Sequence, residues 1–151
     1  MKKVIITIGC PGSGKSTLVK DILSKNKNVV VCSADNFFMK NGVYEWNPSK
    51  IRNAHEYCQK MFLDTLNDDS IEIIIVDNTN ITKRDRKFYI DNAKKFTNNI
   101  EFLIPEDFKS AIASKNNEDN LNQWVEIFAK RNVHSVPAQT IKRMILNYQR
   151  P

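Results

Sequence analysis

The sequence lacks several features that mark particular classes of protein. Its three cysteines form no CxxC pair and are odd in number, so neither a zinc site nor a disulfide framework is indicated. No apolar stretch approaches the roughly 20 residues that a membrane helix needs, and residues 4–8 are too short for the apolar core of a signal peptide. We therefore expect a soluble intracellular protein, cytoplasmic and without a membrane partner, although a nuclear location stays open.

Two further absences concern domains and the nucleotide base. The 151 residues contain no internal repeat and leave little room for a second domain, so we expect one domain over residues 1–151. No N/T-K-x-D segment, which would recognise a guanine base, follows a predicted strand, so ATP is the expected phosphoryl donor. Basic residues are in excess, with a net charge of +6. This excess favours a polyanionic partner, but a lysine- and asparagine-rich composition explains it equally well.

Short apolar runs alternate with helical patterns along the chain. Apolar runs predict strands at residues 3–8, 29–33, 71–76 and 100–104, of which the first two are expected to be buried. Periodicity of 3.6 residues predicts helices at residues 16–25, 48–66, 83–96, 124–130 and 137–148. Residues 34–47 are expected to be irregular, and residues 114–123 to form a loop or a frayed helical turn. Strands alternating with helices indicate an α/β fold, a parallel sheet of four or five strands with helices on both faces.

The segment GCPGSGKST, residues 9–17, fits the phosphate-loop pattern G-x-x-x-x-G-K-[ST] between a predicted strand and a predicted helix. Backbone N–H groups in such a loop cradle phosphates at a helix N-terminus. We expect Lys15 to reach the β- and γ-phosphates, Ser16 to ligate Mg²⁺ and Thr17 to contact the α-phosphate. The predicted nucleotide-binding residues are Gly12, Ser13, Gly14, Lys15, Ser16 and Thr17. Cys10 is interpreted as a small buried filler.

Two aspartates follow predicted strands and should lie at the same sheet edge as Lys15. Asp77 ends IEIIIVD and is a candidate to hold Mg²⁺ through water, an interpretation that we favour over a loop-initiating Asp that bonds its own backbone. Asp35, in SADNFF, is a candidate general base for an acceptor hydroxyl, and a turn or helix-cap role is equally compatible with its position. Two acids and a phosphate loop at one edge favour phosphoryl transfer.

These motifs together resemble the 5′-hydroxyl polynucleotide kinases and, over residues 33–80, the kinase-like domain of the Nedd4-binding-protein-2 family. The shared segments are SADNFF, GVYEWNP, AHEYC, DNTN and the later KRNVHSV. The resemblance implies a three-layer kinase fold with a small arginine-bearing lid at about residues 126–137. It implies Lys15 and Ser16 as phosphate and metal residues, Asp35 as general base, and Arg131 as a catalytic lid arginine.

Two positions depart from the polynucleotide kinase pattern. Phe38 stands where those enzymes have an acceptor-binding arginine, and Asn78 stands where they have an acid before Thr-Asn, with Asp77 one place earlier. Phe37 and Phe38 could stack on a nucleobase or plug the core. His134 is expected to order the lid turn. His55, Trp46 and Trp124 are expected to be structural.

The sequence therefore predicts an ATP- and Mg²⁺-dependent kinase that phosphorylates 5′-hydroxyl ends of RNA or DNA. Two alternatives remain at this point. One is a kinase for a small metabolite or an aminoacyl-tRNA, which the missing acceptor arginine favours. The other is a nucleotide-dependent binding module without phosphoryl transfer.

Overall fold

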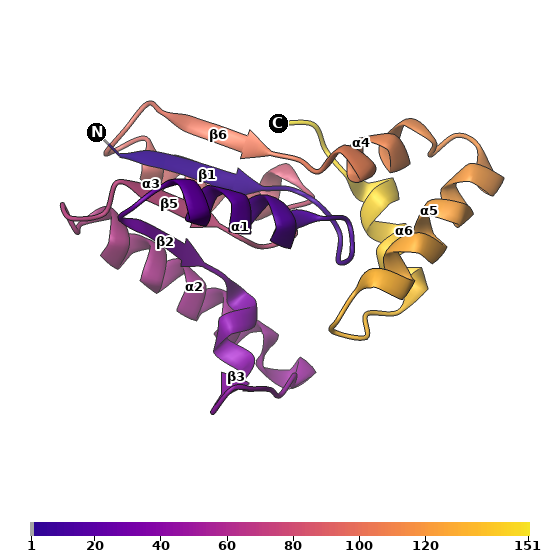
Figure 1. Cartoon of the computed structure of the whole chain (residues 1–151), viewed down its shortest axis with the longest axis horizontal. Helices are drawn as coiled ribbons and strands as arrows, with labels where there is room; N and C mark the ends of the chain where they lie inside the picture. Colours follow the sequence, from indigo (N-terminus) through magenta and orange to yellow (C-terminus); the bar gives the residue numbers. More distant parts are fainter. Residues whose placement is uncertain (1) are drawn as a thin grey trace.

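The computed structural model describes residues 2–151 and is built around a four-stranded, fully parallel sheet (Figure 1). The strand order is β2-β5-β1-β6, and the strands are β1 (Lys3–Thr7), β2 (Val29–Cys32), β5 (Ile73–Val76) and β6 (Ile100–Leu103). Central β1 pairs Ile5 with Ile75 of β5 on one side and with Glu101 of β6 on the other. The predicted parallel sheet of four strands is confirmed.

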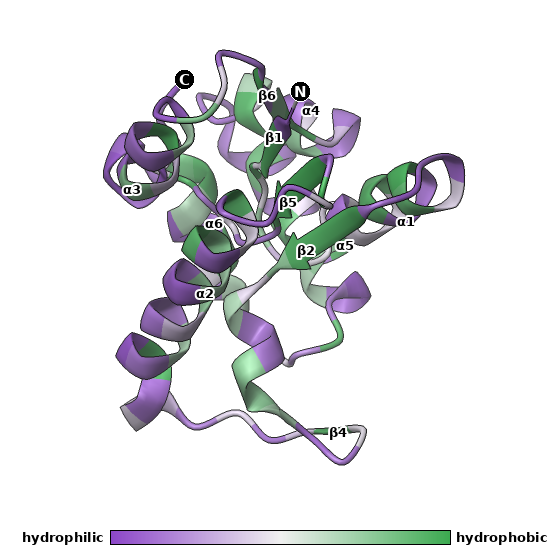
Figure 2. Cartoon of the chain, turned by 90° about the vertical axis from the view of Figure 1, so that its left-hand side faces the viewer, coloured by the Kyte–Doolittle hydropathy of each residue, from purple (hydrophilic) through white to green (hydrophobic). Residues whose placement is uncertain are grey.

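Helices cover both faces of this sheet, because alternate residues of each strand point to opposite sides. On one face Ile5 and Ile75 pack with Val19 of α1 (Lys15–Lys25). On the other face β1 contributes Val4 and Ile6 to a core with α2 (Ile51–Leu66) and α3 (Lys83–Ala93). Figure 2 shows the resulting hydrophobic strands between more polar helices. The three-layer α/β fold is therefore confirmed.

The C-terminal third forms a helical cluster beyond the ends of β1 and β6 (Figure 1). It consists of α4 (Glu106–Ala113), α5 (Glu118–Arg131) and α6 (Ala138–Asn147). The prediction of a loop or frayed turn over residues 114–123 is wrong for most of that stretch, and α4 was not predicted. Asn117 caps α5 by accepting from the Asn120 N–H, acidic residues fill the first turn, and Leu121 is fully buried.

Residues 34–50 are more regular than the sequence suggested. A short 3₁₀ helix, η1 (Ala34–Phe38), leads into a hairpin of β3 (Met39–Lys40) and β4 (Val43–Tyr44). Asn41 and Gly42 at its tip have φ values of 52° and 79°, as a two-residue Asn-Gly hairpin turn requires. The predicted helix start at Asn47 is confirmed, since Asn47 caps η2 (Pro48–Lys50), which continues into α2.

Within residues 2–151, no helix is both long and apolar enough to cross a membrane.

Candidate active site

The phosphate loop connects the end of β1 to the first turn of α1. Gly12 and Gly14 have φ values of 80° and 109°, in the region that favours glycine. A Cβ atom on Gly12 would lie 2.2 Å from the backbone oxygen of Phe128 in α5. The loop therefore has room for no side chain at this position, and the C-terminal end of α5 lies directly against it.

Lys15 begins α1 and reaches back across the loop. Its Nζ donates a 2.7 Å hydrogen bond to the Gly9 carbonyl oxygen. Burial lowers the pKa of Lys15, while the negative charges of Asp77 and Asp35 act in the opposite direction. Both predicted acids therefore act on the lysine of the phosphate loop, as their positions after β5 and β2 suggested. Ser16 and Thr17, in the same first helical turn, are exposed.

Asp77 lies at the end of β5, half-buried beside β1. The Thr7 hydroxyl is 3.4 Å from Asp77 Oδ1 and 2.9 Å from the Asn78 carbonyl oxygen. Burial raises the pKa of Asp77, and the ammonium group of Lys15 opposes that rise. The Asn78 side chain accepts a 2.9 Å hydrogen bond from the Ala34 N–H, so it ties the end of β5 to η1. This tie places the Asp77 and Asp35 segments side by side.

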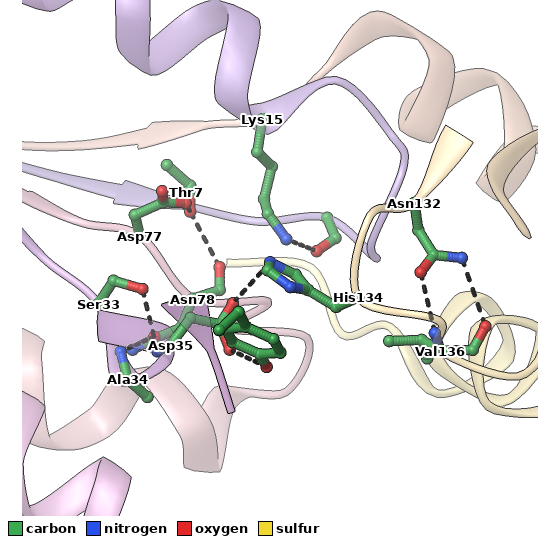
Figure 3. A network of polar contacts seen from close by, with 12 residues as sticks. Thr7, Lys15, Ser33, Ala34, Asp35, Asp77, Asn78, Asn132, His134 and Val136 are labelled. Carbon is green, nitrogen blue, oxygen red and sulfur yellow. Dashed lines mark hydrogen bonds and ion pairs between the residues drawn. The ribbon is translucent and has the colours of Figure 1, made fainter. Parts of the chain in front are cut away.

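Asp35 occupies the first turn of η1 with its side chain exposed. The Ser33 hydroxyl accepts from the Asp35 N–H at 3.2 Å and holds the turn. The Tyr44 hydroxyl donates to Asp35 Oδ1 at 3.4 Å, and His134 Nε2 lies 3.7 Å from Asp35 Oδ2 (Figure 3). Burial first, and the Asp35 charge second, raise the pKa of Tyr44 to about 12, so this phenol is a donor at neutral pH.

Arg131 pairs with an acid of a neighbouring helix in this structure. It is the last residue of α5, and its Nη1 donates a 2.7 Å hydrogen bond to Asp107 Oδ2 of α4. Both side chains are exposed. The predicted lid range, residues 126–137, divides into the last turns of α5 and a connection to α6 that begins at Asn132.

Within that connection Asn132 makes the ordering contacts that were expected of His134. Its amide nitrogen donates to the Ala129 oxygen at 2.8 Å, and its amide oxygen accepts from the Val136 N–H at 2.9 Å. His134 instead faces Asp35 and Tyr44 (Figure 3). Tyr44 was missed as a site residue, although the Asn-Gly turn just before it signals a hairpin that could return it to Asp35.

The remaining aromatic and histidine predictions have mixed outcomes. Phe38 is buried in the core of α2 and the sheet, and Phe37 packs partly against it. Trp124 packs on Phe128, as expected of a structural residue. Trp46 is 56% exposed, so its predicted packing role is wrong. The reason is that the loop before η2 lies outside the sheet core. His55 is exposed on α2.

Residues 4–151 match the family model described as AAA domain. The chain belongs to this family. It is 31% identical over 147 residues to human NEDD4-binding protein 2, covering 97% of this chain and 8% of that protein. The chain is thus a phosphate-loop, kinase-like domain, and the resemblance to the Nedd4-binding-protein-2 family is confirmed.

Solved structures give the same fold. A chain of the Pnkp1/Rnl/Hen1 RNA repair complex matches with a TM-score of 0.67 and 18% identity over 97% of this chain and 43% of that chain. A second structure of the Pnkp1/Rnl/Hen1 complex matches with a TM-score of 0.55 and 24% identity, over 70% and 36% of the two chains. The chain therefore spans less than half the length of each of these three relatives.

Proposed function

We propose that this domain is a kinase that transfers the γ-phosphoryl group of ATP to the 5′-hydroxyl end of a polynucleotide. The observation that carries the proposal is that Asp35 and the phosphate loop lie at one edge of the sheet. The Ala34–Asn78 hydrogen bond ties η1 to the end of β5, and the Gly9 N–H of the loop donates to the Thr79 carbonyl oxygen just beyond it. A nucleotide-binding module without transfer has no need of an exposed carboxylate there. A kinase needs a carboxylate to accept the proton of the attacking hydroxyl.

The phosphate loop fits the phosphates of a nucleoside triphosphate. Lys15 Nζ donates to the Gly9 carbonyl in this structure, so its ammonium group is already folded over the loop and can exchange this contact for phosphate oxygens. Gly12, Ser13 and Gly14 would present N–H groups to the phosphates, and Thr17 its hydroxyl. ATP with Mg²⁺ supplies the transferable phosphoryl group and neutralises part of its charge.

The side chains near the phosphate loop could bind a magnesium ion only if phosphate oxygens supplied further ligands. Within residues 2–151, no group of three or more His, Cys, Asp or Glu side chains could hold a metal ion. Mg²⁺ commonly takes one or two protein ligands and completes its shell with phosphates and water. The Ser16 hydroxyl is the proposed direct ligand, and Asp77 the proposed acid that binds through water.

The proposed step uses three further groups of this chain. Asp35 holds the acceptor hydroxyl and takes its proton as the new bond from oxygen to γ-phosphorus forms. The bond between γ-phosphorus and the β,γ-bridging oxygen breaks, and ADP leaves. Lys15 stabilises the negative charge on the β- and γ-phosphates. Arg131 is proposed to leave Asp107 and close with residues 126–137 as a lid over that charge, within one domain that spans residues 1–151.

The nucleic-acid acceptor is supported by the net charge of +6 and by the resemblance of the motifs to those of 5′-hydroxyl polynucleotide kinases. The decisive experiment follows transfer of γ-labelled phosphate from ATP-Mg²⁺ to short 5′-hydroxyl RNA and DNA strands. We expect Asp35→Asn to lower the rate by about 10²- to 10⁴-fold while calorimetry shows unchanged ATP binding. Asp64→Asn, an exposed aspartate of α2, is the matched control. Undiminished transfer by Asp35→Asn would overturn the general-base role, and labelled free phosphate alone would overturn the acceptor class.

A further inference from the structure

A groove of about 350 Å³ opens beside η1, between Phe37 and the segment that runs from the hairpin to η2. Phe37 forms one wall and is fixed there by two ring contacts, with Phe38 at 5.4 Å and Tyr57 at 5.8 Å between ring centroids. Trp46 also lines the groove. The cavity size is sufficient for a small planar ligand, since ligand pockets begin at about 300 Å³.

Trp46 is available for a ligand. Its side chain is 56% exposed although indole is among the largest apolar groups. Among residues 2–151, Trp46 makes no ring-to-ring contact with another aromatic side chain, whereas Phe37 and Phe38 both do. A largely exposed indole can stack on a nucleobase, and stacking of this kind tolerates any base.

The charges on the groove favour an anionic ligand. Lys40 and Lys50 line it and are exposed, and Glu45 is its one acidic residue. Asn47 adds an amide, although its oxygen already accepts from Ser49. Lysines beside aromatic side chains are the combination by which proteins bind single-stranded nucleic acid, since cations contact the backbone and rings contact the bases.

The groove is linked to the candidate active site through η1, which carries Asp35 and also Phe37 and Phe38 of the groove lining. A 3₁₀ helix rises about 2 Å per residue, so Phe37 lies about 4 Å along the axis from Asp35. A strand whose 5′-hydroxyl lies at Asp35 would therefore reach the groove within its first few nucleotides.

We infer that this groove binds the first bases of a single-stranded acceptor, with a base stacked on Trp46 and the backbone contacted by Lys40 and Lys50. The inference rests on the proposed kinase function and adds the location and strandedness of the acceptor. Bases of a duplex are already stacked on one another, so the groove selects single-stranded or frayed 5′ ends.

Tryptophan fluorescence tests binding without phosphoryl transfer. The chain has two tryptophans, so Trp124→Phe, remote from the groove in α5, leaves Trp46 as the only one. Titration of this variant with a 5′-hydroxyl RNA octamer, without ATP, should quench the emission saturably. A blunt duplex of the same sequence should leave it unchanged. Absence of quenching by the octamer, or equal quenching by the duplex, would overturn the inference.

Steady-state kinetics provides the second readout. In the unmodified background, Trp46→Ala should raise the KM for the octamer about fivefold to 150-fold, the range for loss of one stacked base. Its kcat and its KM for ATP should not change, because the groove binds the acceptor alike before and during transfer. Trp46→Phe should restore most of the loss. Phe96→Ala, which removes another exposed aromatic far from the groove, should have no effect.

Salt dependence tests the lysines. Lys50→Ala should reduce the slope of log K against log salt concentration by about 0.7, the value for one phosphate contact on a single strand. Lys94→Ala, at the end of α3, should leave the slope unchanged. If the octamer quenches Trp46 but no phosphoryl transfer occurs, the proposed kinase function is wrong and the binding groove is supported. If transfer occurs but Trp46→Ala leaves the KM for the octamer unchanged, the kinase function is supported and the binding groove is wrong.

Discussion

The imidazole ring of His134 stacks on the phenol ring of Tyr44 with 4.1 Å between their centroids. Tyr44 ends the hairpin that follows η1, and His134 belongs to the connection between α5 and α6. Both side chains also approach Asp35, Tyr44 through its hydroxyl and His134 through Nε2 (Figure 3). Two segments far apart in the sequence therefore meet over the proposed general base, and the contact closes one side of the site.

This relationship makes Tyr44 a positioning residue for Asp35. Tyr44→Phe retains the ring that stacks on His134 but removes the donor to Asp35. We expect kcat to fall about twofold to tenfold, the value of one net hydrogen bond, with the KM for ATP unchanged. Tyr57→Phe, on the exposed side of α2, is the control and should change neither kcat nor the KM for ATP. Equal kinetics for Tyr44→Phe and the unmodified protein would show that Asp35 needs no help from the phenol.

Arg131 and Asp107 provide a test of lid movement. If Arg131 leaves Asp107 to bind phosphate, Arg131→Ala should lower kcat by about 10³-fold or more, as for other arginines that stabilise phosphoryl transfer. Asp107→Asn should leave kcat unchanged or raise it, since it frees the guanidinium group. Because both side chains are exposed, each substitution should change the free energy of unfolding by less than about 1 kcal/mol.

The neighbouring Lys130, which pairs with Glu126 on the same helix, is the matched control for that experiment. Lys130→Ala should leave kcat unchanged. A loss of activity in Asp107→Asn as large as that in Arg131→Ala would contradict lid movement, because it would mean that the ion pair itself is needed.

Gly12 tests the contact between the phosphate loop and α5. Gly12→Ala would introduce a Cβ atom 2.2 Å from the Phe128 carbonyl oxygen at a φ of +80°. We expect the free energy of unfolding to fall by about 2 kcal/mol or more, from backbone strain and overpacking together, and ATP binding to weaken. Urea denaturation and calorimetry measure these two effects.

Gly42→Ala separates the two causes. Gly42 has a φ of +79°, but a Cβ atom there meets nothing within 4 Å. This variant carries the strain of positive φ without the clash, so it should lose less stability and keep normal ATP binding. Equal losses in the two variants would show that the α5 contact contributes nothing.

The buried cysteine thiols should resist alkylation in the folded protein and should make its stability sensitive to alkaline pH. Burial raises the pKa of Cys10 and of Cys32 to about 12, from an ordinary 9.0. Both thiols are therefore protonated at pH 8 and should react with iodoacetamide far more slowly in the native protein than in urea. Mass spectrometry counts the alkylated sites. Rapid labelling of Cys10 in the folded protein would contradict its role as a buried filler.

The effect on stability has a definite sign. A group whose pKa is higher in the folded protein than in the unfolded chain favours folding fully below pH 9, and this contribution is lost as the pH rises through about 12. The free energy of unfolding should therefore fall over this window. Cys10→Ala should show a shallower fall than the unmodified protein does. Parallel pH curves for the two proteins would contradict the assignment.

Much of the fold could be read from local patterns. The Val- and Ile-rich runs of the central strands β1 and β5 are buried on both faces, so their composition reveals them without knowledge of their neighbours. The phosphate loop is likewise revealed by glycines at positive φ, and the start of η2 by the side-chain acceptor of Asn47 followed by Pro48. Even the meeting of Asp35 and Asp77 near Lys15 followed from the sequence, because parallel strands end at one edge.

Local patterns failed where structure depends on contacts between distant segments. The start of α5 is polar in sequence, and its burial comes from a core shared with Ile8 and Cys10 of the phosphate-loop segment. The pairing of Arg131 with Asp107 depends on how α4 packs against α5. The contact between Tyr44 and His134 depends on where the β3–β4 hairpin meets the connection between α5 and α6. The sequence by itself determined the sheet, the phosphate loop and the identity of the acids. The tertiary structure alone decided what faces Asp35, because packing between helices far apart in the chain sets those distances.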